Sequence, residues 1–361
     1  MLTTVIFLLI LLSAVTIHEL AHYINAKSVG LPVRTFSVGV GPVLLRRIWH
    51  NTEWRLSLFP IGGYVDLPGM APTSDDQGKL QHPTNGMAIK SLPEKLWVLS
   101  GGVIANFFLG VILICIVIII SPSYRQITAN VIPFETGALI SSVLPESAAD
   151  SFGLKPLDTI ISINNISNPN RDIVVREIQN SNKLDFLLLR EGATVNLSLP
   201  WPPNDSRATP VLGVHLAPLT IEHTRIGTFE AIGEAFWFSV KLLPKMVHGF
   251  AKGLATTLTG KRSDEIAGPV GIISLVNQAA QIGLAPVLFL AAVINLSLAI
   301  FNLFPIPGLD GGRMLLATVT SLRGKPFRPG QEETIHFFGV FAVLALIVLI
   351  TLNEISGLFN P

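Results

Sequence analysis

Two histidines and a glutamate follow an uncharged run of residues that begins at Met1. Residues 18–22 read "HELAH". Because residues four apart share one face of an α-helix, the imidazoles of His18 and His22 can bind one metal ion, while Glu19 can act on a water molecule held by that ion. This spacing is that of a zinc peptidase. The alternative is a pair of helix-end histidines bound to lipid headgroups or backbone, but ionisable residues inside a membrane span are costly and by default mark function.

A third ligand is needed, because catalytic zinc usually takes three protein ligands and leaves the fourth position to water. The apolar stretch "NLFPIPGLDGG" at residues 302–312 offers Asp310. The prolines and glycines of this stretch break a helix, which lets backbone and carboxylate turn inward beside protein or a wet cavity. The alternative is a simple turn that leaves the membrane.

The composition indicates a membrane protein. Hydrophobic residues make up 49% of the chain and charged residues 14%, unlike an ordinary soluble domain. Besides the opening run, three apolar stretches are close to the ~20 residues that cross a hydrocarbon core of ~30 Å: residues 97–120, 285–307 and 335–352. The single cysteine, Cys115, excludes an intrachain disulfide and a cysteine-based metal site.

Basic residues predict the orientation. They gather in the loop between the first two spans and in the short loop between the last two, so both loops should be cytoplasmic. Both termini and the long segment 121–284 should then lie outside. This topology places His18, His22 and Asp310 at one depth, on the cytoplasmic side.

The remaining segments predict three further structures. Residues 34–66 alternate between apolar and polar around "HNTE", as in a β-hairpin or small sheet near the membrane. Residues 126–200 combine short β-branched runs with an amphipathic stretch, as in a compact β domain with one or two helices. Residues 226–280 have helical periodicity but too many charges for a span, which favours helices on the membrane surface.

Together, the two motifs and the predicted outer β domain resemble the site-2 protease family of intramembrane zinc metalloproteases. The resemblance covers nearly the whole chain. Within the family, the chain most resembles the bacterial and plastid branch with one PDZ domain, the regulator-of-sigma-E-protease type. Five further stretches are similar to family segments: "FSVGVGP" (36–42), "PIGGYVDLPG" (60–69), "SGGVIANF" (100–107), "VLPESAADSFGLKPLDTIISINN" (143–165) and "IAGPVGI" (266–272).

The resemblance implies roles for individual residues. His18, His22 and Asp310 would bind one Zn²⁺, and Glu19 would be the general base. Asn302 would hold substrate or stabilise the oxyanion, with Asn106 as a second polar candidate. The substrate would be a transmembrane protein pre-trimmed by another protease, of anti-sigma-factor or signal-peptide type, with no nucleic acid involved. The location would be the bacterial inner membrane, or a plastid membrane, with both termini outside the cytoplasm.

The predicted fold is thus a polytopic α-helical membrane protein with four transmembrane helices, a membrane-associated β-hairpin and an inserted extracytoplasmic PDZ domain. Its segments are transmembrane helix 1 with the HExxH motif (1–24), a cytoplasmic loop with the hairpin (25–94), transmembrane helix 2 (95–121), the PDZ domain (126–220), interfacial amphipathic helices (221–283), transmembrane helix 3 with the LDG motif (284–320), a cytoplasmic loop (321–332) and transmembrane helix 4 (333–353).

Two positions depart from the family pattern. Ala21 stands inside the HExxH motif where the family usually has glycine, and alanine is still small. Leu157 stands where the usual Gly-Asp turn of the PDZ stretch has its glycine. A leucine is costly in a turn that needs a positive φ, so the PDZ fold is expected without an intact peptide-carboxylate pocket.

Two other classes of protein remain open. A catalytically inactive scaffold that uses only its PDZ domain would not need Glu19 between two histidines. A transporter could use broken helices in the same way, but it would show paired inverted repeats, and the sequence shows none. Metal content together with cleavage of a model transmembrane substrate separates the three classes. The sequence leaves open the substrate, the priming protease and the oligomeric state.

The orientation has a direct test by labelling of single introduced cysteines. We expect positions 75–85 and 323–330 to react from the cytoplasmic side and positions 165–205 from the outside, because basic loops are retained in the cytoplasm. The opposite pattern would overturn both the topology and the common depth of the three ligands.

Overall fold

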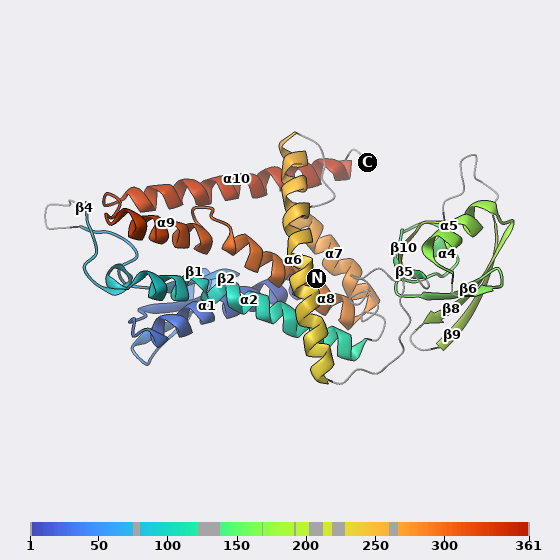
Figure 1. The fold of residues 1–361 in the computed structure, drawn as a ribbon, viewed down its shortest axis with the longest axis horizontal. Coiled ribbons are helices and arrows are strands. Elements are labelled where there is room, and N and C mark those ends of the chain that lie inside the picture. Colours follow the sequence, from blue (N-terminus) through green and yellow to red (C-terminus); the bar gives the residue numbers. More distant parts are fainter. Residues whose placement is uncertain are drawn as a thin grey trace. The chain divides into compact units, whose positions relative to one another are not determined.

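A computed structural model gives the fold for residues 2–74, 80–121, 138–167, 169–190, 193–201, 212–218, 228–259 and 266–359 (Figure 1). The chain forms two compact units. The first consists of residues 1–113 and 242–361, and the second of residues 114–241. The predicted PDZ range 126–220 and the predicted interfacial range 221–283 both include residues outside the described ones, namely 126–137, 168, 191–192, 202–211, 219–227 and 260–265.

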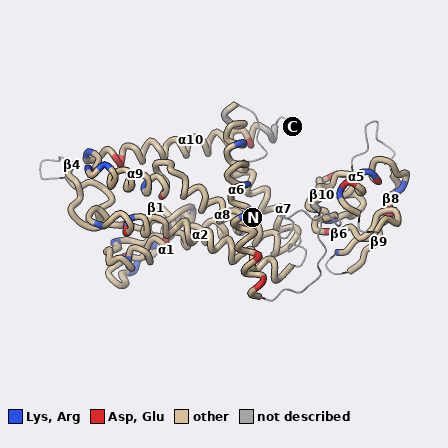
Figure 2. The backbone as a smooth tube through the Cα atoms, viewed as in Figure 1, with Lys and Arg blue, Asp and Glu red and all other residues tan. Residues whose placement is uncertain are grey.

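Within the described residues, four helices are long and apolar enough to cross a membrane. They are α1 (Leu2–Ser28), α2 (Leu92–Ile120), α8 (Leu284–Leu303) and α10 (Gln331–Phe359). Helices suit this environment because they satisfy their backbone hydrogen bonds internally, where lipid offers none. Charged residues are absent from α8, and Figure 2 shows the middle of α10 without them. The prediction of a membrane protein with four spans is confirmed at this level.

The third predicted span differs from the structure in one respect. Residues 284–320 form two helices, because α8 ends at Leu303 and α9 (Asp310–Arg323) begins at Asp310. The connection contains Pro305 and Pro307, which lack the N–H that would continue a helix, and Gly308, whose φ is +99°. The break therefore puts Asp310 in the first turn of a new helix.

A hairpin follows α1, where the alternating pattern predicts one. Strands β1 (Thr35–Trp49) and β2 (Thr52–Asp66) are antiparallel and joined by His50 and Asn51, which both have positive φ. The first part of β1, residues 35–38, has partners in two segments of β2, residues 53–56 and 63–66. Residues 63–66 therefore form an edge of this small sheet.

The hairpin has a buried base and an exposed apolar far half. At the base, the rings of Tyr23 of α1, Phe36 and Trp54 contact each other, with centroids 4.6–6.0 Å apart. These contacts fix the sheet to the end of α1 that carries His22. Farther out, large apolar side chains are exposed: Val43, Leu44, Leu45, Ile48 and Trp49. An exposed apolar surface of this kind is suited to contact a bilayer.

Short elements and further helices complete the first unit. Strands β3 (Thr73–Ser74) and β4 (Leu80–Gln81) form a small ladder, followed by the 3₁₀ turn η1 (Gly86–Ile89). Helix α7 (Pro269–Ile282) is tied to α10, because the Glu354 carboxylate accepts hydrogen bonds from the backbone N–H groups of Gly268 and Gly271. Helix α6 (Thr228–Leu258) belongs to both units.

The second unit contains an antiparallel sheet with two helices. Its strand order is β10-β5-β6-β8-β9, with β7 paired to β6. The elements are β5 (Ala138–Val143), α4 (Ala148–Ser151), β6 (Thr159–Ile163), β7 (Ile166–Ser167), α5 (Arg171–Asn180), β8 (Lys183–Arg190), β9 (Ala193–Pro200) and β10 (Val214–Pro218). A β-rich fold with two helices is what its pattern of apolar residues predicts.

The turn before β6 holds a strained residue beside a buried ion pair. Leu157 has a φ of +72°, in the left-handed region that favours glycine. Asp158 is fully buried, and its two carboxylate oxygens accept hydrogen bonds of 2.7 Å from the Arg190 guanidinium. The strain at Leu157 is therefore tolerated because the buried pair and the Leu157 N–H bond to the Ile140 carbonyl, at 2.7 Å, hold the turn.

Replacing Leu157 by glycine should stabilise this unit. A left-handed conformation costs roughly 1–2 kcal/mol in a residue with a Cβ, so Leu157→Gly should raise the local free energy of unfolding by up to about 1 kcal/mol. Native-state hydrogen exchange of the β6 amides in the full chain measures that free energy. Leu157→Ala, which keeps the Cβ, is the control and should give no gain. A loss of protection in both variants would mean that packing of the leucine side chain outweighs the strain.

Candidate metal centre

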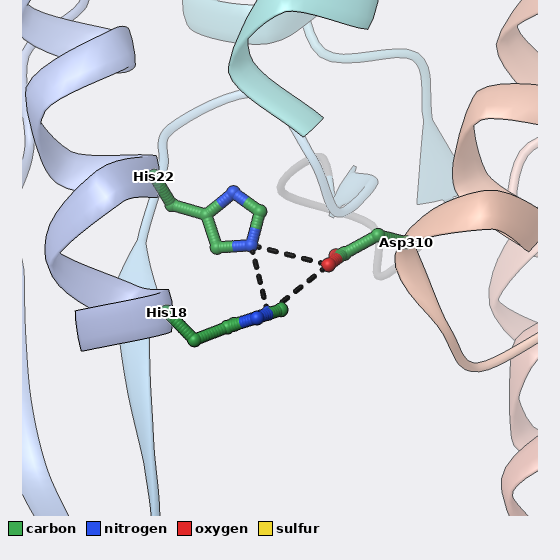
Figure 3. A group of neighbouring side chains, drawn as sticks. All are labelled: His18, His22 and Asp310. Carbon is green, nitrogen blue, oxygen red and sulfur yellow. Dashed lines mark hydrogen bonds and ion pairs between the residues drawn. The ribbon is translucent and has the colours of Figure 1, made fainter. Parts of the chain in front are cut away.

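Three predicted metal ligands meet in the structure. Nε2 of His18 and Nε2 of His22, both on α1, lie 3.1 Å apart, and Oδ2 of Asp310 on α9 lies 3.1 Å and 3.2 Å from them (Figure 3). The two histidines are 8% and 7% exposed. Zinc held tetrahedrally by bonds of about 2.0–2.1 Å has ligand atoms about 3.3 Å apart. The donor types and their separations therefore fit a zinc ion with three protein ligands.

The ring of His22 is oriented by the backbone of α2. Its Nδ1 lies 2.8 Å from the carbonyl oxygen of Val98, which can only accept a hydrogen bond. The proton of the neutral ring is therefore on Nδ1, and Nε2 presents a lone pair towards Asp310 and His18. Metal-binding histidines are typically held in this way by a carbonyl or carboxylate on the other ring nitrogen.

The ring of His18 has Asn106 as its partner. The carboxamide Nδ2 of Asn106 lies 3.3 Å from His18 Nδ1, the residue is 1% exposed, and Oδ1 has no partner among the described residues. The two ends of a carboxamide have nearly the same shape, so a half-turn brings Oδ1 to Nδ1. In that orientation His18 Nδ1–H donates to Oδ1, and His18 Nε2 keeps its lone pair free for a metal.

Glycines of α2 make room for this arrangement. A Cβ at Gly102 would overlap the imidazole of His18. A Cβ at Gly101 would lie 2.9 Å from Asn25 Nδ2 and 3.0 Å from the backbone of Ala21. The stretch "SGGVIANF" thus lets α2 approach α1 closely at the level of the cluster, and Ala21 is small enough to keep that approach.

Glu19 lies beside the hairpin edge. Its Cγ is 3.3 Å from the position that a Cβ on Gly63 would occupy. Among the described residues its carboxylate has no hydrogen-bond or ion-pair partner within bonding distance. A carboxylate next to the cluster, without such a partner, is available to accept a proton.

Asn302 is not brought into the cluster. It lies in the last turn of α8, half-buried, and among the described residues no hydrogen bond joins it to His18, His22 or Asp310. Its substrate or oxyanion role stays a prediction.

Sequence reasoning missed His336, which lies on α10 next to the loop that carries Asp310. Its Nδ1 accepts a hydrogen bond of 2.8 Å from the backbone N–H of Gly308. A signal was present, because His336 is an ionisable residue within the apolar run 335–352.

The four apolar helices and the embedded cluster of two histidines and an aspartate define a membrane metallopeptidase. The chain belongs to peptidase family M50, the site-2 protease family, whose sequence model matches residues 6–346. The resemblance to this family is thereby confirmed, and zinc is the metal that the names of its relatives specify. The chain is a zinc metalloendopeptidase.

Three relatives illustrate the similarity. "Putative zinc metalloprotease R01501" of Rhizobium meliloti is 31% identical over 381 residues, covering 99% of this chain and 96% of the relative. "Zinc metalloprotease RasP" of Oceanobacillus iheyensis is 26% identical over 447 residues, covering 99% of this chain and all of the relative. "Probable membrane metalloprotease ARASP2, chloroplastic" of Arabidopsis thaliana is 29% identical over 366 residues, covering 95% and 78%.

The close approach at Gly102 makes a prediction about metal affinity. Gly102→Ala should weaken zinc binding by about tenfold or more, because the added methyl group displaces the His18 ring. Competition with a chromophoric chelator measures this on purified protein. The matched control is Gly110→Ala on the same helix, where the new Cβ would lie 2.8 Å from Leu296 and away from the cluster. The control should lower stability without changing zinc affinity; equal affinity in both variants contradicts the role of Gly102.

Proposed function

We propose that this protein is an intramembrane endopeptidase that cleaves transmembrane segments of membrane proteins, as the second cut in regulated intramembrane proteolysis. The observation that carries the proposal is the convergence of His18, His22 and Asp310 beside Glu19, on helices that include a candidate membrane span. His18, His22 and Asp310 are the zinc ligands, and Glu19 is the general base.

The chain's own residues divide the chemistry between them. Bound zinc supplies Lewis acidity and lowers the pKa of water towards ~7. Glu19 takes a proton from the attacking water and returns it to the leaving amine. Val98 and Asn106 keep the two imidazoles in the tautomer that leaves Nε2 free. Asn302 is proposed to hold substrate or to stabilise the oxyanion, since it stands at the end of α8 that leads to the Asp310 loop.

The hairpin edge is the proposed place for the substrate backbone. A helical substrate must unwind before a peptide bond becomes accessible, and an unwound segment can pair with an exposed strand edge. Residues 63–66 have strand partners on one side only among the described residues, and Gly63 is the part of that edge next to Glu19. This placement favours substrate pairing over simple structural closure.

The second unit is proposed to be a PDZ domain within residues 126–220. Its antiparallel sheet with two helices supports that fold. The strained Leu157 and the buried pair of Asp158 and Arg190 belong to the turn in which the family usually has Gly-Asp. We propose a bacterial inner membrane, or a plastid membrane, as the location, with both termini outside the cytoplasm. Pre-trimmed transmembrane proteins, such as anti-sigma factors or signal peptides, are the proposed substrates.

Ligand and base variants test the proposal. Purified protein should bind about one zinc per chain, and His18→Ala, His22→Ala and Asp310→Ala should each deplete it, because each removes one of three ligands. Glu19→Gln should retain zinc and lose cleavage of a model transmembrane substrate by roughly 10²-fold or more, because it removes only the base. Zinc is measured by elemental analysis and cleavage by gel assay.

Each variant has an outcome that contradicts its assignment. Full zinc occupancy and activity in Asp310→Ala would mean that another residue is the third ligand. Turnover of Glu19→Gln near that of the wild type would place the base elsewhere. Zinc binding without cleavage by the wild-type protein would favour the inactive scaffold.

A further inference from the structure

Helix α10 holds the loop that carries Asp310. Residues 304–309 connect α8 to α9, and α10 lies beside α9 (Figure 1), with Thr320 Oγ1 donating to the Glu332 carboxylate at 3.5 Å. A Cβ at Gly308 would lie 2.7 Å from the Val340 side chain. A Cβ at Gly339 would overlap the backbone carbonyl of Pro307. The loop and α10 are therefore in direct backbone contact.

The hydrogen bonds of the loop single out one donor. Pro305 and Pro307 have no N–H, and the N–H groups of Phe304, Ile306 and Leu309 bond to carbonyls within α8 or the loop itself. The N–H of Gly308 instead donates to His336 Nδ1 on α10, at 2.8 Å. Within the described residues, this is the one backbone N–H of 304–309 whose bond leaves the loop and its flanking helices.

A histidine is a costly residue to place there. His336 lies in a helix that qualifies as a membrane span, where a polar side chain needs a partner because lipid supplies none. Its bond with Gly308 also selects one tautomer, since Nδ1 must be unprotonated to accept. An acceptor fixed in this position satisfies the Gly308 N–H from outside the loop.

We propose that His336 is a positioning residue for Asp310. By accepting the Gly308 N–H two residues before Asp310, it fixes the loop so that the carboxylate meets His18 and His22. The inference rests on the proposed role of Asp310 as a zinc ligand. His336 itself touches none of the three ligands in the described contacts.

Three substitutions at residue 336 separate acceptor geometry from simple packing. In His336→Asn, Oδ1 can take about the place of the imidazole Nδ1. In His336→Gln the carboxamide is one bond farther out, and in His336→Phe the ring shape remains without an acceptor. The full-length protein is used in detergent or nanodiscs. Hydrogen exchange of the peptide covering 304–309 is followed by mass spectrometry in metal-free protein, and zinc affinity is measured by chelator competition.

The expected order of the variants is specific. Gln and Phe should speed exchange of the Gly308 amide by about tenfold or more, because its bond is lost. They should also weaken zinc binding by about tenfold, as loss of a group that orients a ligand does elsewhere. Asn should stay near the wild type in both measurements.

Two results would overturn the inference. One is wild-type exchange and zinc affinity in His336→Phe, and the other is an Asn variant that behaves like Phe. If His336→Phe does not fold, the contrast between Asn and Gln decides by itself. If the wild type binds no zinc at His18, His22 and Asp310, the proposed function fails. The exchange rate of the Gly308 amide still shows in that case whether His336 orders the loop.

Discussion

Polar groups in an apolar surrounding must find their partners within the protein, and the contacts around His18, His22 and Asp310 follow from that requirement. Each imidazole has a hydrogen-bond partner on its second nitrogen, Val98 for His22 and Asn106 for His18. These partners come from α2, which reaches the rings because residue 102 is a glycine. The carboxylate comes from α9, whose first turn exists at this place because prolines end α8. With these contacts in place, the three ligand atoms are 3.1–3.2 Å apart.

The sequence predicts those parts of the site that depend on the spacing of residues close together in the chain. HExxH places two histidines on one helix face, and the prolines and glycines around Asp310 predict a helix break. The four spans and the hairpin follow from runs and alternation of apolar residues. The contact between His336 and Gly308 could not be predicted in the same way, because nothing local relates residues on different helices. The double pairing of residues 35–38 depends on bends at Gly39 and Gly41, both with positive φ, which periodicity does not show.

The two halves of the hairpin lie in different surroundings. Its base is buried against Tyr23 and carries the edge strand next to Glu19. Its far half leaves apolar side chains such as Leu45 and Trp49 exposed. A Cβ at Gly39 would lie 2.8 Å from the Phe59 carbonyl oxygen, so the glycine allows β1 and β2 to come together between these two regions. The sheet thereby brings a strand edge to the cluster without interrupting α1.

The bond between Glu354 and the start of α7 gives α10 a second fixed point besides His336. The two residues are 18 positions apart on one continuous helix, which corresponds to about 27 Å along its axis. At one point α10 binds the loop before Asp310, and at the other it binds the start of α7. Because α10 makes a fixed contact with each of them, a shift of α10 along its axis would displace the Asp310 loop and the start of α7 together. Helix α10 therefore couples the position of the metal-ligand loop to that of α7 over this length.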